Sequence, residues 1–167
     1  MSKSDKSLKI LFVCEGNICR SPMAQVIFSN LCKRHKKRAE VKSAGTFTMP
    51  GFAMTQSACD ALEMCGEGVA RPISTTLWHD SMTKEFDHIV CMANHHARAI
   101  DPRGESENVY TLDSVVRCGD IPDPWLMPVD VYVGVCRVLQ MALAELYKQI
   151  FSPSKNKTKK GASNGQK

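Results

Sequence analysis

The feature that most constrains how this 167-residue chain can fold is a short apolar run followed by a loop and a helical pattern. The run covers residues 8–13, and its nearly continuous hydrophobicity is typical of a strand buried on both faces of a parallel sheet. Ser21 and Pro22 form a helix-start signal, and apolar residues then recur at helical spacing over residues 23–31. This part of the chain therefore predicts a central strand, a loop and a helix.

The rest of the chain alternates between strand-like and helix-like segments. We expect strands at residues 40–44, 87–92 and 108–112, a helix at residues 55–64, and a long helix at residues 130–150 with Asp130 as its N-cap. Strands that alternate with helices favour right-handed crossovers and a parallel sheet. The pattern thus predicts an α/β fold.

The net charge of +5 is concentrated at the C-terminal end. Residues 152–167 contain five lysines and no acidic residue, whereas residues 1–151 carry 17 basic and 17 acidic side chains. A Lys-, Ser- and Asn-rich segment cannot bury enough apolar surface to offset its ordering entropy. We therefore expect one globular domain over residues 1–151 and a disordered basic tail over residues 152–167, which is a solvated end rather than a nucleic-acid-binding arm.

Hydropathy and cysteine usage indicate a cytoplasmic protein. No apolar run reaches the roughly 18 residues of a membrane span, and the first residues lack the apolar stretch of a secretory signal. We expect reduced thiols at all eight cysteines, which are residues 14, 19, 32, 59, 65, 91, 118 and 136. Because no C-x2-C pair exists and His95 and His96 have no cysteine pair at zinc-finger spacing, we predict no metal site and read both histidines as surface or ordinary helix residues.

The segment between the first strand and its helix, C-E-G-N-I-C-R-S-P at residues 14–22, carries the clearest chemical signal. Ligands of open α/β sheets bind at the carboxyl ends of the strands, where Cys14 is expected. Inward-facing backbone N–H groups and a helix N-terminus together bind anions. Gly16 and Asn17 are residue types that tolerate left-handed backbone angles. We therefore predict a phosphate site, against the alternative of a tight turn with a buried cysteine.

The side chains of this loop suit covalent phosphoryl transfer. The anion-binding N–H groups and Arg20 favour the thiolate form of Cys14, which is a strong nucleophile. The planar fork of Arg20 matches two phosphate oxygens and the equatorial oxygens of an in-line transition state. Ser21 can donate a hydrogen bond to the sulfur, which stabilises it as a leaving group. An ATPase is excluded because the lysine of a Walker loop is absent.

A general acid is also needed, because an alkyl or aryl oxygen leaves poorly without a proton. Asp123 is the candidate, since it lies in I-P-D-P-W, where two prolines predict an irregular loop. The same carboxylate could later activate water against a phosphocysteine. Taken alone, Asp-Pro is also a common turn dipeptide.

Four motifs together resemble the low molecular weight protein tyrosine phosphatase family over residues 7–151. They are V-C-E-G-N-I-C-R-S-P, S-A-G-T at residues 43–46, F-D-x-I-x-C-M at residues 86–92 and D-P-W at residues 123–125. The resemblance implies a three-layer α/β sandwich with a four-stranded parallel sheet in the order 2-1-3-4, flanked by helices on both faces. It also implies no metal or cofactor and a two-step reaction through a phosphocysteine.

By position, the resemblance makes Cys14 the nucleophile, Arg20 the phosphate-binding residue and Asp123 the proton donor. It implies a supporting hydrogen-bond network of Asn17, Ser21 and Ser43. The residues expected to contact substrate are Glu15, Gly16, Asn17, Ile18, Cys19, Ser21 and Trp125. The resemblance also suggests a reversible disulfide between Cys14 and Cys19, the alternative being that Cys19 is a buried thiol that never reacts.

The chain departs from the family pattern at several positions. Gly68 stands where many members have a histidine, Ala93 where many have an aspartate, and Leu126 where some have a second aromatic residue. The resemblance therefore does not extend to these parts of the supporting network and of the pocket wall. Glu15, beside the nucleophile, would repel acidic peptides or favour basic ones.

Alternative functions share the same loop. In the related protein arginine phosphatases a threonine typically occupies the position of Ile18, so an apolar residue there favours phosphotyrosine. Thiol-coupled arsenate reductases need a further close cysteine pair on a mobile loop, which Cys91 and Cys118 do not form in sequence. A module that only binds phosphorylated ligands would not need Cys14. The expected partners are phosphotyrosine proteins or peptides and oxyanions such as phosphate, bound by a monomer without nucleic-acid or membrane partners.

Overall fold

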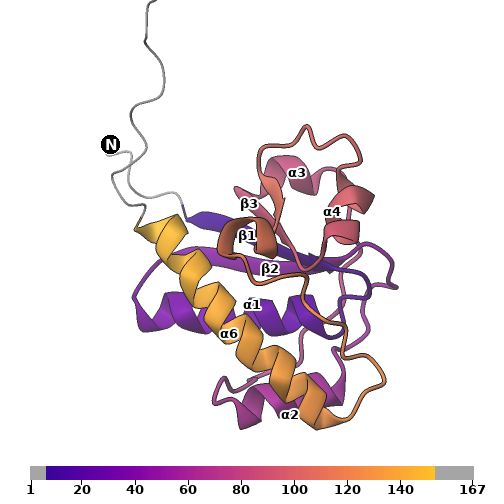
Figure 1. Ribbon diagram of the computed structural model, residues 1–167, viewed down its shortest axis with the longest axis vertical. Coiled ribbons are helices and arrows are strands. Elements are labelled where there is room, and N and C mark those ends of the chain that lie inside the picture. The colour runs from indigo at the N-terminus through magenta and orange to yellow at the C-terminus, as the bar shows by residue number, and fades with distance from the viewer. Residues whose placement is uncertain (1–6, 153–167) are drawn as a thin grey trace, which may run out of the picture.

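The computed structural model describes residues 7–152 as a central sheet covered by helices (Figure 1). The predicted basic tail, apart from Ser152, lies outside the described residues. In chain order the elements are β1 Leu8–Cys14, α1 Arg20–Arg34, β2 Ala39–Gly45, α2 Gln56–Met64, α3 Met82–Glu85, β3 His88–Cys91, α4 Asn94–Ile100, β4 Val109–Thr111, α5 Leu112–Val116 and α6 Val129–Phe151.

All four strands are parallel and lie in the order β2-β1-β3-β4, which confirms the predicted α/β topology. The central strand β1 pairs with both β2 and β3. Its residues from Ile10 to Cys14 are buried, as the continuous apolar run predicts for a strand covered on both faces.

Side chains alternate between the two faces of β1, and a separate apolar core packs against each face. Ile10 and Phe12 point into the larger core, which is completed by α1, α2 and α6. Leu11 and Val13 point into the smaller core, where Met82 of α3 and residues of α4 pack. Figure 1 shows the resulting three layers, with α1, α2 and α6 on one side of the sheet and α3 and α4 on the other.

The long C-terminal helix begins one residue earlier than predicted, so the assignment of Asp130 as its N-cap was wrong. Pro128 occupies the N-cap position, and its carbonyl accepts a hydrogen bond from the Val131 N–H at 3.0 Å. Asp130 lies in the first turn instead, where its carboxylate is favoured by the positive end of the helix dipole. In the part of the chain that the structure describes, no helix is both long and apolar enough to cross a membrane.

Candidate active site

The loop between β1 and α1 joins the carboxyl end of a central strand directly to a helix N-terminus. Cys14 is the last residue of β1 and Arg20 the first of α1. Cys19, the N-cap residue, makes no side-chain hydrogen bond to the first turn. The N–H groups of that turn therefore have no side-chain cap, an arrangement that binds anions.

Close packing against β2 shapes this loop. Asn17 adopts a positive φ of 52°, as predicted for a tight wrap. Gly16 also tolerates such angles but does not adopt a positive φ; a Cβ there would lie 3.3 Å from Cγ1 of Ile18. Gly45 is the glycine that the wrap requires, because a Cβ at this position would lie 2.5 Å from the carbonyl oxygen of Glu15.

A buried hydrogen-bond network supports the Cys14 thiol. The Sγ of Cys14 lies 3.0 Å from the hydroxyl of Ser21. The Nδ2 of Asn17 donates to the hydroxyls of Ser21 at 2.8 Å and Ser43 at 2.9 Å. The Ser43 hydroxyl in turn donates to Oε1 of Gln25 at 2.7 Å. The structure thus brings together the three residues predicted to support the nucleophile.

The Ser21 hydroxyl has one proton and two acceptors within reach. It lies 3.0 Å from the Cys14 sulfur and 3.3 Å from the carbonyl of Ala44, while it accepts from Asn17. A thiolate attracts this proton more strongly than a neutral thiol does. Ser21 can therefore turn its proton to Cys14 when the sulfur is ionised and to Ala44 when it is not.

The hydrogen-bond network around Asn17 is complete without the histidine that many relatives have where this chain has Gly68. The Oδ1 of Asn17 accepts a hydrogen bond from the backbone N–H of Thr76 at 2.8 Å. Gly68 itself lies exposed after α2, with a φ of 43°. Ala93, where many relatives have an aspartate, is buried and forms the N-cap of α4 without a side-chain hydrogen bond. No sequence motif identifies Gln25 and Thr76, because only the fold brings them to Ser43 and Asn17.

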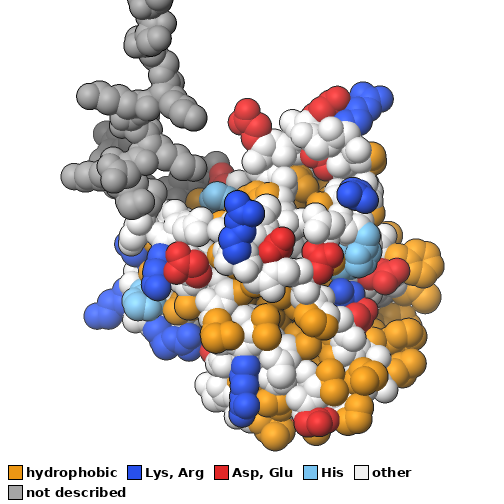
Figure 2. Space-filling model, in the orientation of Figure 1, with side chains coloured by type: hydrophobic (Ala, Val, Ile, Leu, Met, Phe, Trp, Pro, Cys, Tyr) orange, Lys and Arg blue, Asp and Glu red, His pale blue; other side chains and the backbone are white. Residues whose placement is uncertain are grey.

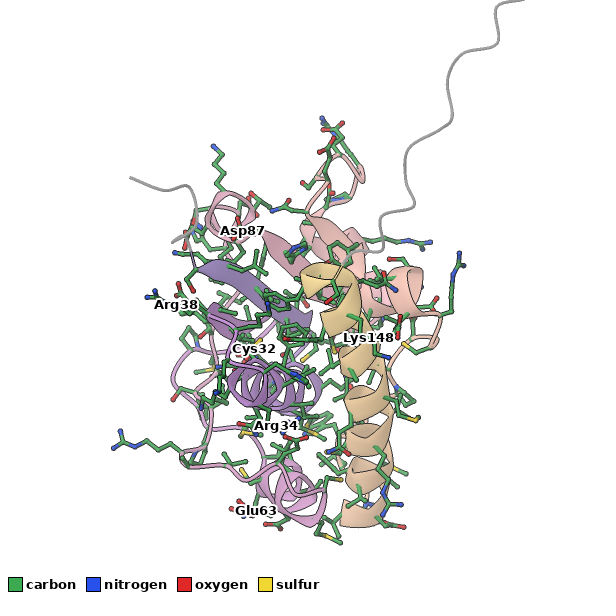
Figure 3. All side chains as sticks on the ribbon, turned by 90° about the vertical axis from the view of Figure 1, so that its left-hand side faces the viewer. Cys32, Arg34, Arg38, Glu63, Asp87 and Lys148 are labelled. Carbon is green, nitrogen blue, oxygen red and sulfur yellow. The ribbon has the colours of Figure 1, made fainter. Side chains whose placement is uncertain are left out.

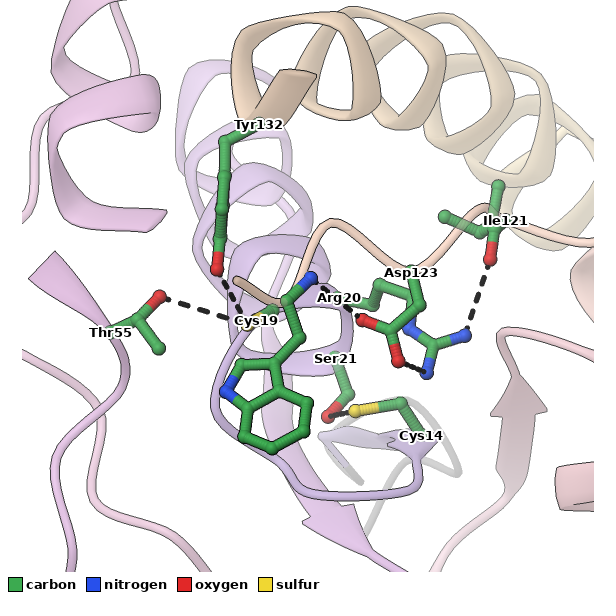
Figure 4. A network of polar contacts seen from close by, with 9 residues as sticks. Cys14, Cys19, Arg20, Ser21, Thr55, Ile121, Asp123 and Tyr132 are labelled. Carbon is green, nitrogen blue, oxygen red and sulfur yellow. Dashed lines mark hydrogen bonds and ion pairs between the residues drawn. The ribbon is translucent and has the colours of Figure 1, made fainter. Parts of the chain in front are cut away.

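Asp123 and Arg20 meet above the thiol (Figure 4). The Nη2 of Arg20 donates to Oδ2 of Asp123 at 2.7 Å, and its Nη1 donates to the carbonyl of Ile121 at 3.3 Å. The Arg20 side chain is 5% exposed and the Asp123 side chain 45%. The guanidinium is thus buried at the base of the site, whereas the carboxyl group lies at the mouth with access to solvent.

The loop that carries Asp123 is anchored to the end of β3. The Ile121 N–H donates to the carbonyl of Met92 at 2.8 Å. The side chain of Asp120 accepts from both the backbone and the amide of Asn94, each at 3.0 Å. Within the loop, the Trp125 N–H donates to Oδ1 of Asp123 at 3.1 Å. These bonds hold the carboxyl group over the carboxyl end of β1.

A pocket of about 580 Å³ opens over these residues, with Cys14, Arg20 and Asp123 in its lining. Ile18 and Trp125, both predicted to contact substrate, line it together with Glu15, Gly16 and Cys19. Figure 2 shows hydrophobic side chains gathered along the edge to which the strands point. The large exposed apolar residues in the segments around the mouth are Phe47, Met49, Phe52, Trp125, Leu126 and Met127.

Phe47 and Phe52 also line the pocket, although no motif identified them. They come from the irregular segment between β2 and α2, whose position depends on tertiary contacts such as the 2.6 Å bond from the Thr75 N–H to the Phe52 carbonyl. Leu126 does not line the pocket and is 81% exposed. The pocket therefore has a second aromatic wall. It comes from the segment between β2 and α2, and not from the Asp123 loop, where Leu126 replaces the aromatic residue of some relatives.

Cys19 is almost fully buried at the wall of the pocket. Its Sγ lies 3.4 Å from the hydroxyl of Tyr132 and 3.7 Å from that of Thr55. Burial raises the pKa of Cys19 above its ordinary value, against the opposing effect of these two hydroxyls. Burial likewise raises the pKa of Tyr132 to about 12, so the phenol stays neutral as a hydrogen-bond partner. Cys19 is therefore held as a neutral thiol beside the nucleophile.

The two neighbouring histidines differ sharply. His95 is exposed, whereas His96 is fully buried and both of its ring nitrogens lack a partner among the described residues. Burial and, to a smaller extent, the positive charge of Arg20 lower the pKa of His96 to about 3. His96 is thus a neutral core residue. Within residues 7–152, no cluster of three His, Cys, Asp or Glu side chains could hold a metal ion.

The buried His96 predicts a loss of stability in acid. Its pKa is depressed in the folded state, so between pH 6.5 and 3 the unfolded chain binds a proton that the folded chain does not. The free energy of unfolding should fall by up to about 2 kcal/mol from pH 7 to pH 5, measured by urea denaturation. His96→Gln should reduce this loss, whereas His95→Gln, the exposed neighbour, should leave it unchanged. The same acid loss in His96→Gln as in the wild type would contradict the assignment.

The Asn17 network predicts a combined loss of stability and activity in Asn17→Ala. The substitution leaves the buried partners of Asn17 unsatisfied, and alanine at this positive φ has no side-chain hydrogen bond to offset the backbone strain. We therefore expect the free energy of unfolding to fall by about 2–4 kcal/mol. Displacement of Ser21 should lower kcat by roughly tenfold or more. Asn17→Gly relieves only the backbone strain, so it should recover part of the stability and none of the kcat. Wild-type kcat in both variants would contradict a role of this hydrogen-bond network in catalysis.

Comparison with known proteins gives consistent matches along the chain. The family model of the low molecular weight phosphotyrosine protein phosphatases matches residues 9–157. The chain is 31% identical over 150 residues to a protein-arginine-phosphatase of Bacillus subtilis strain 168, covering 86% of this chain and 97% of the relative. It is 32% identical over 130 residues to the low molecular weight protein-tyrosine-phosphatase PtpB of Staphylococcus epidermidis strain RP62A, covering 75% and 86%.

A solved structure shares the fold as well. The low molecular weight protein tyrosine phosphatase from T. tengcongensis superposes with a TM-score of 0.81 at 31% identity. The match covers 86% of this chain and 99% of that one.

Proposed function

Because the chain belongs to the low molecular weight phosphotyrosine protein phosphatase family, we propose that it hydrolyses phosphotyrosine in proteins and small aryl phosphates through a phosphocysteine. The observation that carries this proposal is the convergence of Cys14, Arg20 and Asp123 in the lining of one pocket. A nucleophile, a phosphate-binding fork and an acid are the groups that the two steps require.

In the first step, the Cys14 thiolate attacks phosphorus in line with the leaving phenolic oxygen. The guanidinium of Arg20 binds two equatorial oxygens, where charge develops in the transition state. Asp123, in its protonated form, donates its proton to the phenolic oxygen. A sulfur–phosphorus bond forms, the oxygen–phosphorus bond breaks, and the phenol leaves. Substrate phosphate competes with Asp123 for Arg20, so binding itself frees the carboxyl group from the 2.7 Å ion pair.

In the second step, water hydrolyses the phosphocysteine. The Asp123 carboxylate accepts a proton from the attacking water, and the sulfur–phosphorus bond breaks. Ser21, 3.0 Å from the sulfur, stabilises the departing thiolate. Inorganic phosphate is released, and Asp123 is again protonated for the next substrate.

The pocket wall favours an aromatic phosphoester. The half-buried Ile18 and the exposed rings of Phe52 and Trp125 line the space above the thiol. A phenyl ring buries apolar surface there and can pack against aromatic rings. We therefore place phosphotyrosine ahead of alkyl phosphoesters, whose shorter side chains leave these walls unused.

Phosphoarginine is the second candidate substrate, because the chain is 31% identical to a protein named protein-arginine-phosphatase. Ile18 distinguishes the two candidates. The resemblance places a threonine at this position in arginine phosphatases, where its hydroxyl can accept a hydrogen bond from the polar guanidinium. The apolar Ile18 cannot provide that hydrogen bond and leaves such a group unpaired.

Parallel assays of a phosphotyrosine and a phosphoarginine peptide of the same sequence test this preference. We expect kcat/KM to favour phosphotyrosine by roughly tenfold in the wild type, because an unpaired buried polar group costs about 1–3 kcal/mol and about 1.4 kcal/mol corresponds to a factor of ten. Ile18→Thr should shift the ratio toward phosphoarginine. A wild-type preference for phosphoarginine would replace the proposed substrate and retain the same reacting groups.

We also propose a cytoplasmic location and a reversible Cys14–Cys19 disulfide. All eight cysteines are free thiols in the structure, which suits a reducing compartment. Cys19 lies in the same loop as the nucleophile, contacts the hydroxyls of Tyr132 and Thr55, and is kept as a neutral thiol by burial. Oxidation of this pair would block Cys14 and protect it from further, irreversible oxidation.

A further inference from the structure

Three residues spaced one helical turn apart on α6 make polar contacts along the boundary with α2. The first is Tyr132, whose hydroxyl contacts both Cys19 and Thr55, the N-cap of α2. The third is Gln140, whose amide donates to the carbonyl of Cys65 at 3.1 Å and to Oε1 of Glu67 at 2.8 Å. Cys136 lies between them, and its thiol is in contact with that of Cys65. Figure 3 shows α6 crossing beside α1 and α2.

The two thiols of this middle contact differ in exposure. Cys136 is fully buried in the larger core. Cys65 is partly exposed, forms the C-cap of α2, and directs its Sγ toward the carbonyl of Val133 at 4.0 Å. Val133 lies one turn before Cys136 on α6, so Cys65 is seated against the same stretch of helix. Neither cysteine belongs to the phosphate-binding loop.

We propose that Cys65 and Cys136 form a second oxidisable pair, which hydrogen peroxide converts to a disulfide between α2 and α6. Cys65 loses its proton to solvent, its thiolate attacks one peroxide oxygen, and the oxygen–oxygen bond breaks to give a sulfenic acid and hydroxide, which takes up a proton from solvent to become water. The Cys136 sulfur then attacks the Cys65 sulfur, its proton leaves with the sulfenic oxygen, and a second water is released. Two thiols lose two electrons in total, and one peroxide gains them.

The order of these steps follows from the environment of each thiol. Solvent, and therefore peroxide, reaches Cys65 but not Cys136. Burial, and then the neighbouring Cys65, raise the pKa of Cys136, which keeps it protonated until a sulfenic acid is beside it. Cys65 is thus the thiol that is oxidised first, and Cys136 the one that resolves it.

The disulfide would stabilise the two helices that hold Cys19. It would join residues 65 and 136 across a long segment of chain, which restricts the unfolded state. It would lie one turn of α6 from Tyr132, whose hydroxyl contacts the Cys19 sulfur. The pair would therefore fix the α2–α6 boundary under the oxidising conditions in which Cys14 itself is at risk.

The test is peroxide treatment of the full chain, followed by alkylation of free thiols, proteolysis and fragment mass spectrometry. We expect a peptide pair joined through Cys65 and Cys136, lighter than the two reduced peptides by two hydrogen atoms. The midpoint of thermal unfolding should rise on the order of 5 °C on oxidation, and dithiothreitol should reverse the rise. Cys65→Ser, which changes only the partly exposed partner, should remove the cross-link and the rise.

Cys118→Ser is the matched control, because Cys118 is another partly exposed thiol and has no cysteine partner among the described contacts. It should retain both the cross-link and the thermal shift. Full alkylation of Cys65 and Cys136 after peroxide has oxidised other thiols would overturn the proposal. So would a cross-link of Cys65 to any other cysteine. None of these readouts depends on phosphatase activity, so the pair and the proposed function can fail separately.

Discussion

Cys14→Ser is expected to eliminate phosphate release, lowering kcat by about 10⁴-fold or more on every substrate. A serine hydroxyl is not ionised at neutral pH, so the nucleophile of the first step is lost. The fold should persist, because serine is close in size to cysteine and can keep the hydrogen bond to Ser21, 3.0 Å from the Cys14 sulfur. The measurement is kcat for p-nitrophenyl phosphate and a phosphotyrosine peptide, together with the midpoint of thermal unfolding.

Cys59→Ser provides the matched control for this variant. Cys59 is also a buried thiol, but it belongs to α2 and not to the lining of the pocket. It should retain nearly full kcat. If Cys14→Ser kept activity within tenfold of the wild type, covalent catalysis by Cys14 would have to be abandoned.

Asp123→Asn is expected to lower kcat on a phosphotyrosine peptide by roughly 10²–10³-fold, and less on p-nitrophenyl phosphate. An amide cannot give a proton to the leaving phenol. Nitrophenolate leaves readily without one, so the first step on that substrate depends less on the acid. The substitution also removes the ion pair to Arg20, so inorganic phosphate should inhibit this variant at least as strongly as the wild type.

Asp120→Asn separates this effect from a general disturbance of the loop. Asp120 lies three residues away on the same loop, where its carboxylate holds Asn94 and makes no contact with Arg20. It should lower activity equally on the two substrates, through displacement of the loop alone. An equal loss on both substrates in Asp123→Asn as well would argue against a general acid at this position.

The sequence predicts the part of the site in which neighbouring residues decide the geometry. A buried apolar strand, a short loop and a Ser-Pro helix start place Cys14 and Arg20 at the two ends of one loop. Asn17 at positive φ follows from the same local requirement. The order of the strands follows from the family motifs, because alternation alone predicts parallel pairing but not which strands are neighbours.

The rest of the site depends on contacts between distant segments. Phe47 and Phe52 reach the pocket from an irregular segment without periodicity, so no pattern places them there. His96 follows an exposed histidine in the sequence, and only the packing of α4 against the sheet decides that it is buried. The Arg20–Asp123 ion pair spans 103 residues and could be expected only from the roles that the resemblance assigns.

The most direct test of the proposed mechanism is to capture the covalent intermediate. The wild-type protein is mixed with excess p-nitrophenyl phosphate, quenched in acid within the first turnovers, and digested for mass spectrometry. We expect a phosphate on Cys14, which Cys14→Ser abolishes and Cys19→Ser retains. A burst of product without a phosphorylated cysteine, or a phosphate on Cys19, would contradict the proposed mechanism.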